Sequence, residues 1–154
     1  DGMEYNSESQ IMYVTGLPYN EVPTNSGSHP WKAGNSYATF PGGLQLGLSV
    51  GSWQTGKAYA YSCAFNIPAN ISVNLSVTYN KVTTLSSSST LNVAQSDLSN
   101  NGTNYISVSN KTATNVTSTG SGVMTNQYNA FYFENSATVV GRQYIITKFT
   151  IQYR

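Results

Sequence analysis

The sequence predicts an all-β fold, a two-sheet antiparallel β-sandwich of the jelly-roll type that spans residues 1–154 as a single domain. Three observations support this. Hydrophobic side chains alternate with a period of two, helical periodicity is nearly absent, and turn residues separate the segments at roughly even spacing. Short, evenly spaced strands are typical of β-sandwiches. A chain of 154 residues is also long enough to bury one core without disulfides or a metal.

The clearest strands lie in the middle of the chain. Segment 57–67 alternates strictly, and the size of its side chains predicts a core face made of Tyr59, Tyr61, Cys63, Phe65 and Ile67. After a break at 68–70, segment 71–79 alternates again, with apolar residues at every odd position. Two such segments around a short break predict a β-hairpin.

Further strands are predicted on both sides of this hairpin. Segment 44–50 alternates leucine with polar residues, and segment 128–134 directs Phe131 and Phe133 inward. In the last segment, 143–153, we expect the odd-numbered side chains on one face, Thr147 and Phe149 among them. Weaker strands are predicted near 10–15, 37–40, 90–93, 105–109 and 111–117, and long loops at 16–36 and 81–89.

Charge is scarce in this chain. Charged residues make up 8% of the sequence, and seven basic against six acidic side chains leave a net charge of +1. Nucleic-acid binding depends on many Lys and Arg contacts to phosphate, so we expect no nucleic-acid partner and favour a neutral ligand. No apolar run reaches the length of a transmembrane helix, so membrane insertion is not expected either.

Residues for catalysis or metal binding are equally few. Cys63 and His29 are the single cysteine and the single histidine, which excludes an ordinary zinc site and an intramolecular disulfide. We expect Cys63 to be a buried apolar residue. No nucleophile motif surrounds His29. The sequence therefore predicts no enzyme, no cofactor and no metal, although a glycoside hydrolase stays open as the third interpretation because two carboxylates suffice for it.

The order of features resembles a known family. The motif Gly-Lys-Ala-Tyr opens a strand at 56–59, and the chain closes on Phe-Tyr-Phe-Glu-Asn at 131–135 and an alternating strand from 143. This arrangement is similar to the jelly-roll carbohydrate-binding modules of polysaccharide-degrading enzymes and of phage tail and baseplate proteins. Those modules often carry a calcium-binding Asp in the last strand, where this chain has Thr147, so the metal site is not transferred.

The resemblance implies a non-catalytic module that binds a bacterial cell-wall or other polysaccharide. It also implies an extracellular or virion location, within a larger multidomain or phage tail protein that recognises a host. The alternative that we keep open is a trimeric phage fibre head or structural virion domain, because β-sequences rich in Ser, Thr, Asn and Gly are typical of those proteins as well.

Candidate ligand contacts follow from how sugars are bound, by stacking on aromatic rings and by hydrogen bonds to polar side chains. Tyr128, Tyr132 and Glu134 should share the outer face of one strand. At the usual strand rise, the two tyrosines would then be about 13 Å apart. Tyrosines there could equally reflect β-propensity alone. The other candidates are Trp31 in the first long loop, Trp53 in a turn, Gln45 and Asn74 on polar strand faces, and Arg142 as a contact for an acidic group.

Overall fold

The computed structural model describes residues 2–6, 11–48, 56–83, 89–125, 130–136 and 141–154. All regular structure in these ranges is β-strand. The strands are β1 (Gly2–Asn6), β2 (Ile11–Thr15), β3 (Tyr19–Glu21), β4 (Lys32–Ala33), β5 (Ala38–Thr39), β6 (Leu44–Leu46), β7 (Ala58–Tyr61), β8 (Ala64–Asn66), β9 (Ser72–Thr83), β10 (Ser89–Ser96), β11 (Asn101–Asn110), β12 (Ala113–Val123), β13 (Ala130–Asn135) and β14 (Arg142–Tyr153). None of these residues forms a helix that could cross a membrane.

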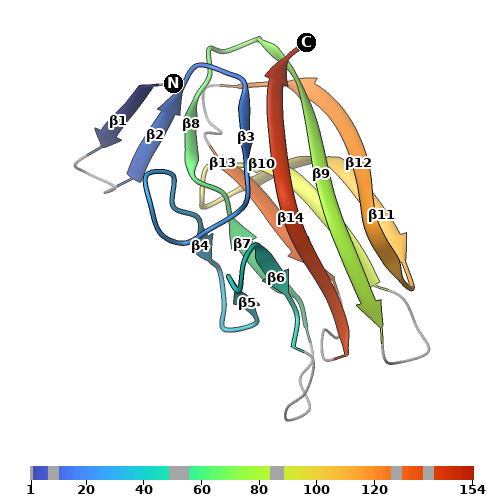
Figure 1. Cartoon of the computed structure of the whole chain (residues 1–154). Helices are drawn as coiled ribbons and strands as arrows, with labels where there is room; N and C mark the ends of the chain where they lie inside the picture. The colour runs from blue at the N-terminus through green and yellow to red at the C-terminus, as the bar shows by residue number, and fades with distance from the viewer. Residues whose placement is uncertain (1, 7–10, 49–55, 84–88, 126–129, 137–140) are drawn as a thin grey trace.

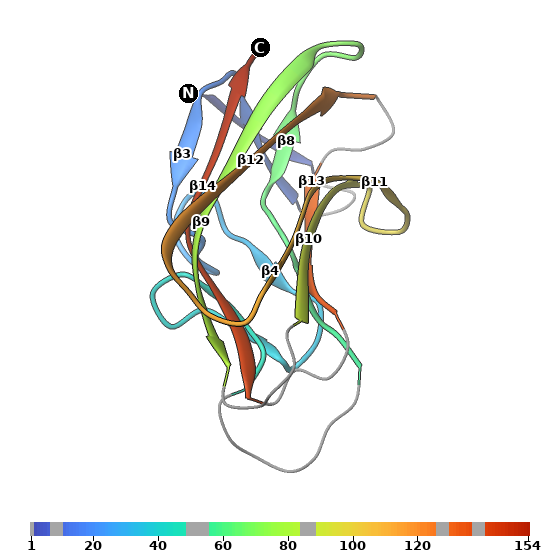
Figure 2. The same ribbon diagram turned by 90° about the vertical axis from the view of Figure 1, so that its right-hand side faces the viewer.

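Two antiparallel sheets are stacked face to face. The five-stranded sheet has the order β11-β10-β13-β7-β4, and the six-stranded sheet has the order β12-β9-β14-β6-β5, with β3 also paired to β14. Figures 1 and 2 show the two layers from the front and from the side. The predicted all-β sandwich of the jelly-roll type is confirmed. A small third sheet, β1-β2-β8, contains a parallel pair between β2 and β8.

Aromatic rings fill the space between the two sheets. Phe133 from one sheet and Phe149 from the other lie edge to face, with ring centroids 5.1 Å apart. Trp31 packs against both, at 5.0 Å from Phe133 and 5.7 Å from Phe149. Its indole Nε1 donates a hydrogen bond of 3.0 Å to the Tyr19 hydroxyl, so the one polar atom of the ring is satisfied inside the core.

The face of β7 that we predicted to point inward in fact points outward. Ala58 and Ala60 are fully buried, whereas Tyr59 and Tyr61 are half-buried on the outer side of the sheet. Strand β4, which follows Trp31 directly, pairs with β7 so that Ala33 lies opposite Ala60. Small side chains therefore face the part of the interior that Trp31 and Phe133 already occupy. The alternation itself was read correctly, and the assignment of its faces was wrong.

A bulge corrects the prediction for the last strand. Pairing between β14 and β9 shifts register between Ile146 and Lys148, which leaves Thr147 without a direct partner. Tyr144 and Ile146 therefore point into the core before the bulge, and Phe149 and Ile151 point into it after the bulge. The prediction that all odd-numbered side chains of this strand share one face holds only after the bulge, since Ile145 and Thr147 lie on the other side.

Cys63 lies between β7 and β8 and is 3% exposed. Burial raises the pKa of its thiol to about 12. Because the thiolate is the reactive form, we expect a maleimide at pH 7.5 to label the native protein at least about tenfold more slowly than the urea-unfolded protein. Equal labelling rates in the two states would show that this segment is open in the native fold.

Lys81 on β9 is 2% exposed, and its Nζ lies 5.1 Å from the centroid of the Tyr144 ring. Burial, followed by the positive charge of Arg142, lowers the pKa of Lys81 to about 8. Between that pKa and the value of about 10.4 in the unfolded chain, the unfolded state binds more protons. The contribution of Lys81 to the free energy of unfolding should therefore rise as the pH increases from about 8 to about 10.4.

Urea unfolding of the wild type and of Lys81→Met at pH 7 and pH 9.5 tests this expectation. The titration of the tyrosines is common to both proteins and cancels in their difference. We expect the stability difference to move in favour of the wild type at the higher pH. A difference that does not change with pH would place Lys81 in solvent in the native state.

Candidate functional site

The residues predicted from the sequence to bind a ligand do not form one site. Tyr132 and Glu134 lie on β13 in the five-stranded sheet, whereas Gln45 and Asn74 lie on β6 and β9 in the six-stranded sheet. The side chains in question face outward on opposite sides of the sandwich. Two further candidates, Trp53 and Tyr128, lie outside the described residues.

Trp31 is a correction to the predicted contacts. It is 3% exposed, and its ring is enclosed by Phe133, Phe149 and Tyr19. A ring that is buried on both faces offers no surface on which a sugar can stack. The long first loop therefore folds inward, and its tryptophan contributes to the core rather than to a binding surface.

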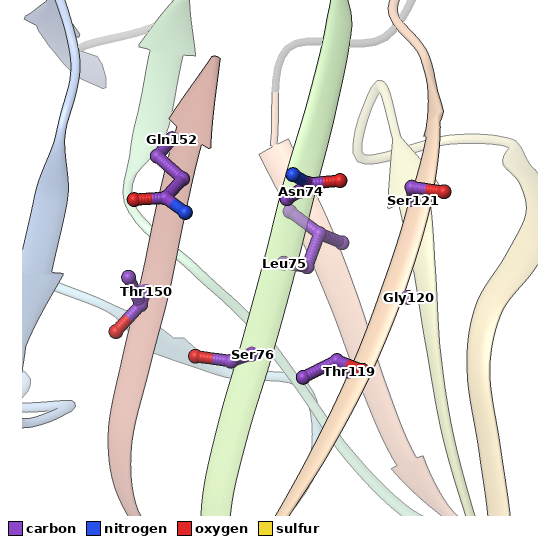
Figure 3. A pocket seen from close by; sticks show the side chains of 8 residues that line it. All are labelled: Asn74, Leu75, Ser76, Thr119, Gly120, Ser121, Thr150 and Gln152. Carbon is purple, nitrogen blue, oxygen red and sulfur yellow. The ribbon is translucent and has the colours of Figure 1, made fainter. Parts of the chain in front are cut away.

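Asn74 lines a shallow trough of about 400 Å³ on the outer face of β14, β9 and β12, which we call the polar trough (Figure 3). Its outward side chains come in two cross-strand rows: the amide row holds both amides together with Ser121, and the hydroxyl row holds hydroxyl side chains only. They are Gln152, Asn74, Ser121, Thr150, Ser76 and Thr119. Gln45 and Arg142 are not part of this lining: Gln45 Nε2 donates to the Gly47 carbonyl at 3.0 Å, and Arg142 starts β14 opposite Thr83.

Aromatic side chains gather on the other outer face, at Tyr59, Tyr61 and Tyr132, which together we call the tyrosine face. Pairing of β13 with β7 sets Tyr132 opposite Tyr61 and Glu134 opposite Tyr59, so all four side chains lie on one side of the sheet. The ring centroids of Tyr59 and Tyr61 are 6.1 Å apart, and that of Tyr132 lies 5.7 Å from Tyr59 and 5.5 Å from Tyr61.

The three rings differ in exposure. Tyr132 is 4% exposed beneath its neighbours, whereas Tyr59 and Tyr61 are half-buried. Gly34 allows the Tyr59 ring to lie close to the loop before β5, since a Cβ at residue 34 would be 2.1 Å from Cδ2 of Tyr59. Tyr59 and Tyr61 therefore present aromatic surface to solvent, and Tyr132 supports them from below.

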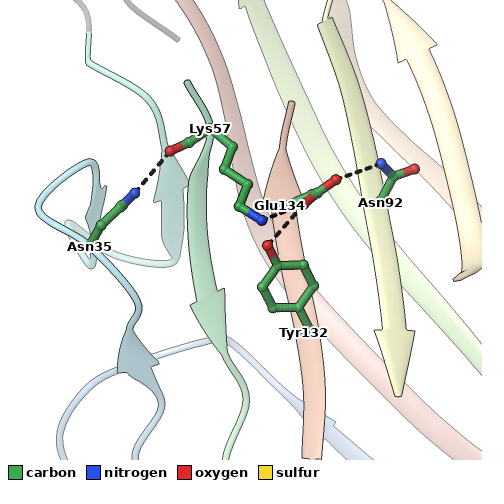
Figure 4. A network of polar contacts seen from close by, with 5 residues as sticks. All are labelled: Asn35, Lys57, Asn92, Tyr132 and Glu134. Atoms are coloured by element: carbon green, nitrogen blue, oxygen red, sulfur yellow. Dashed lines mark hydrogen bonds and ion pairs between the residues drawn. The ribbon is translucent and has the colours of Figure 1, made fainter. Parts of the chain in front are cut away.

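A polar network borders the tyrosine face and is centred on Glu134 (Figure 4). Glu134 Oε1 accepts a hydrogen bond of 2.9 Å from the Tyr132 hydroxyl and lies 3.5 Å from Lys57 Nζ. Glu134 Oε2 accepts a hydrogen bond of 2.9 Å from Asn92 Nδ2, and Asn92 in turn accepts one from Ser107 at 2.6 Å. Both carboxylate oxygens are thus engaged by the protein itself, which fixes the position of Glu134.

Lys57 is the exposed member of this network. Its Nζ lies 5.3 Å from the Tyr59 centroid and 5.4 Å from the Tyr132 centroid, at cation–π distance from both rings. Its backbone carbonyl accepts a hydrogen bond of 2.9 Å from Asn35 Nδ2, which ties the loop before β5 to β7 (Figure 4). The exposed ammonium group of Lys57 supplies hydrogen-bond donors beside the partly exposed ring of Tyr59.

The phenols of Tyr132 and Tyr61 stay protonated at neutral pH. Burial, and then the hydrogen bond to Glu134, raise the pKa of Tyr132. Burial, and then the neighbouring Tyr59, raise the pKa of Tyr61. Neutral phenols can both donate and accept hydrogen bonds, as recognition of hydroxyl groups requires.

The described acidic side chains do not form a catalytic pair. Glu21 on β3 pairs with His29, and Glu134 is held by Tyr132, Lys57 and Asn92. Asp97, in the turn after β10, accepts hydrogen bonds from the backbone N–H groups of Ser99 and Asn100, which lower the pKa of its carboxyl. Within the described part of the chain, no three His, Cys, Asp or Glu side chains lie together as a metal site would require.

Sequence reasoning missed Tyr59, Tyr61, Lys57 and Asn92 as members of this site. Tyr59 and Tyr61 were assigned to the core because of their size, and Lys57 was read only as part of a strand motif. Asn92 enters the network through the pairing of β10 with β13, which places it opposite Glu134. This pairing joins segments about forty residues apart in the chain, and no local pattern signals it.

Comparison with known proteins supports the fold. No protein-family model matches the chain, and no curated protein matches its sequence. Among solved structures, the K1 cleaved adhesin domain of Lys-gingipain from Porphyromonas gingivalis W83 is similar with a TM-score of 0.53 and 14% identity, over 90% of this chain and 99% of that domain. The K3 cleaved adhesin domain of the same Lys-gingipain is similar with a TM-score of 0.51 and 12% identity, over 79% of this chain and 90% of that domain.

A third similar structure is the xylan-binding module CBM15, with a TM-score of 0.53 and 16% identity, over 89% of this chain and 96% of that module. At these identities the likeness shows the fold alone. The chain is a β-sandwich of the kind seen in carbohydrate-binding modules and adhesin domains.

The Glu134 network yields a stability prediction. Glu134→Ala leaves the Tyr132 hydroxyl and Asn92 Nδ2 without their acceptor in a partly buried setting, which should lower the free energy of unfolding by about 1–3 kcal/mol. The matched control is Lys57→Ala, which removes only the exposed partner of Glu134 and should cost less than about 1 kcal/mol. Urea unfolding measures both, and equal losses would show that Glu134 does not anchor this face.

Proposed function

We propose that this domain is a non-catalytic carbohydrate-binding module and that it binds a polysaccharide chain on the tyrosine face. The observation that carries the proposal is the pairing of two partly exposed rings, Tyr59 and Tyr61, with a fixed polar border. Sugars present apolar C–H faces that stack on aromatic rings and hydroxyl groups that need hydrogen-bond partners. The tyrosine face supplies both on one surface.

The orientation of the two rings narrows the kind of ligand. The planes of Tyr59 and Tyr61 are perpendicular, with an interplanar angle of 90°. Perpendicular rings cannot both lie flat on a planar crystalline surface. A soluble chain, whose successive sugar rings turn relative to one another, can contact both. Tyr132 enters this proposal as a supporting residue, and Glu134 enters as the group that positions it.

The structural comparisons support the proposal at the level of fold. One similar structure is described as a xylan-binding module and two as adhesin domains. Xylan is therefore the first soluble polysaccharide to test, within a wider glycan array. A role outside the cell, in a larger protein, suits a module that binds polysaccharide. The phage tail context and the virion location stay predictions from the sequence.

The alternative, a trimeric fibre head or structural virion domain, differs in its assembly. Light scattering coupled to size-exclusion chromatography gives the mass directly. A trimer that binds no glycan on the array would favour that alternative over the module. Release of reducing sugar from a bound glycan would favour the glycoside hydrolase.

Binding should depend on the two partly exposed rings, Tyr59 and Tyr61. Tyr59→Ala and Tyr61→Ala should each weaken binding to a glycan identified on the array by about tenfold or more, because stacking area is lost. Tyr59→Phe should retain most of the affinity, since the ring remains. The matched control is Tyr153→Ala, an exposed tyrosine on β14 in the other sheet. Full binding by folded Tyr59→Ala and Tyr61→Ala, measured by calorimetry, would remove the tyrosine face as the site.

Ionic strength separates a neutral ligand from an acidic one at this face. A neutral chain held by stacking and hydrogen bonds should bind with nearly the same affinity at about 0.05 M and about 0.5 M salt, because screening weakens only interactions between charges. Affinity titrations at both salt concentrations provide the measurement. A steep loss of affinity at high salt would instead point to an acidic ligand and to contacts from Lys57 or Arg142.

A further inference from the structure

The polar trough has hydrogen-bonding capacity that the protein does not use. Asn74, Ser76, Thr119 and Gln152 make no side-chain hydrogen bond to any residue that the structure describes. This contrasts with the tyrosine face, where both oxygens of Glu134 are engaged. The strand backbone below the trough is already paired in the sheet, so a ligand here would be bound by side chains.

The positions of these groups form a regular grid. Gln152, Asn74 and Ser121 are direct cross-strand neighbours, and so are Thr150, Ser76 and Thr119 (Figure 3). The two rows are two residues apart along each strand, or about 7 Å. The trough volume of about 400 Å³ is within the range of small-ligand sites and suits a short stretch of a hydroxyl-rich chain.

A basic side chain lies at each end of the trough. Lys148 is exposed and lies opposite Thr78, one row beyond the hydroxyl row. Arg154 lies beyond the amide row, and its guanidinium donates a hydrogen bond of 3.4 Å to Ser121 Oγ. No ion pair between either residue and a described acidic side chain is present. Glu21, on the neighbouring strand β3, lies opposite the core residue Phe149 and pairs with His29, so it does not face the trough.

We propose that the polar trough is a second glycan-binding site, separate from the tyrosine face, and that it takes an acidic polysaccharide. Amide and hydroxyl side chains hydrogen-bond the sugar hydroxyls, and Lys148 and Arg154 pair with carboxylates borne by the chain. The absence of aromatic rings from the lining suits a chain that is held by polar contacts alone. Charge complementarity distinguishes this ligand from the neutral chain expected at the tyrosine face.

Position in the fold makes the two sites independent. The six-stranded and the five-stranded sheet form the two layers of the sandwich (Figure 2). The trough is on the outer face of the first sheet and the tyrosine face is on the outer face of the second, so the core lies between them. A chain bound at one site does not block the other. A single domain would then hold an acidic chain and a neutral chain at the same time.

Affinity electrophoresis of the wild-type chain through gels that contain polygalacturonate, alginate or neutral xylan tests the proposal. The variants are Asn74→Ala/Gln152→Ala, which removes both amides, and Lys148→Ala, which removes one cation. Thr114→Ala, an exposed position on β12 outside the trough, is the matched control. Circular dichroism establishes that each variant is folded, and dextran sulfate serves as a polyanion that lacks the uronate carboxylate.

We expect polygalacturonate or alginate to retard the wild-type protein. This retardation should be about threefold to tenfold weaker in each trough variant, and added salt should weaken it as well. It should be unchanged in Thr114→Ala and Tyr59→Ala. Retardation by an acidic polymer that survives both trough substitutions, or no retardation by either uronate polymer, overturns the trough site. Equal retardation by dextran sulfate, insensitive to Asn74→Ala/Gln152→Ala, would show non-specific charge attraction and overturns it too. Binding of a neutral glycan by Tyr59→Ala tests the tyrosine face alone, and retardation by the uronate polymers tests the trough alone. Either proposal can therefore be overturned while the other stands.

Discussion

The packing of Trp31 between Phe133 and Phe149 determines how the rest of the sandwich is arranged. These three rings fill the interior where the two sheets are joined by the first loop. Cores are packed near the density of organic crystals, so the neighbouring strand β7 can direct only small side chains into the same space. Ala58 and Ala60 meet that requirement, and the tyrosines between them must then face outward. The candidate binding surface is in this sense a consequence of the core.

The same constraint explains which parts of the fold could be predicted from the sequence. A period of two is a local property, and it correctly identified β6, β7, β9, β13 and β14 as strands. Which face of a strand points inward depends on what lies across the interior. For β9 and β13 one face is clearly more apolar, and the prediction was right. For β7, Ala competes with Tyr for the core, and only the position of Trp31 decides between them.

The candidate site was less predictable than the fold for a related reason. Tyr132 and Glu134 could be placed on an outer strand face from their alternation with Phe131 and Phe133. Their partners come from other strands: Tyr61 through the β7–β13 pairing and Asn92 through the β10–β13 pairing. Strand order is set by long-range packing, which a single sequence does not display. Asn74 was correctly placed on a polar outer face but belongs to the other sheet, since order within the sandwich separates β9 from β13.

The two outer faces carry different side chains, so the ligands that we propose for them would be held by different interactions. On the five-stranded sheet, Glu134 neutralises Lys57 and fixes Tyr132, so charge is balanced locally and aromatic surface dominates. On the six-stranded sheet, Lys148 and Arg154 flank a grid of amides and hydroxyls, and no carboxylate of the described side chains faces it. A net charge of +1 over the whole chain therefore conceals an uneven distribution. Sequence composition alone favoured a neutral ligand, and a neutral ligand remains our proposal for the tyrosine face. The acidic ligand proposed for the polar trough differs, because a sum of charges says nothing about where each charge lies.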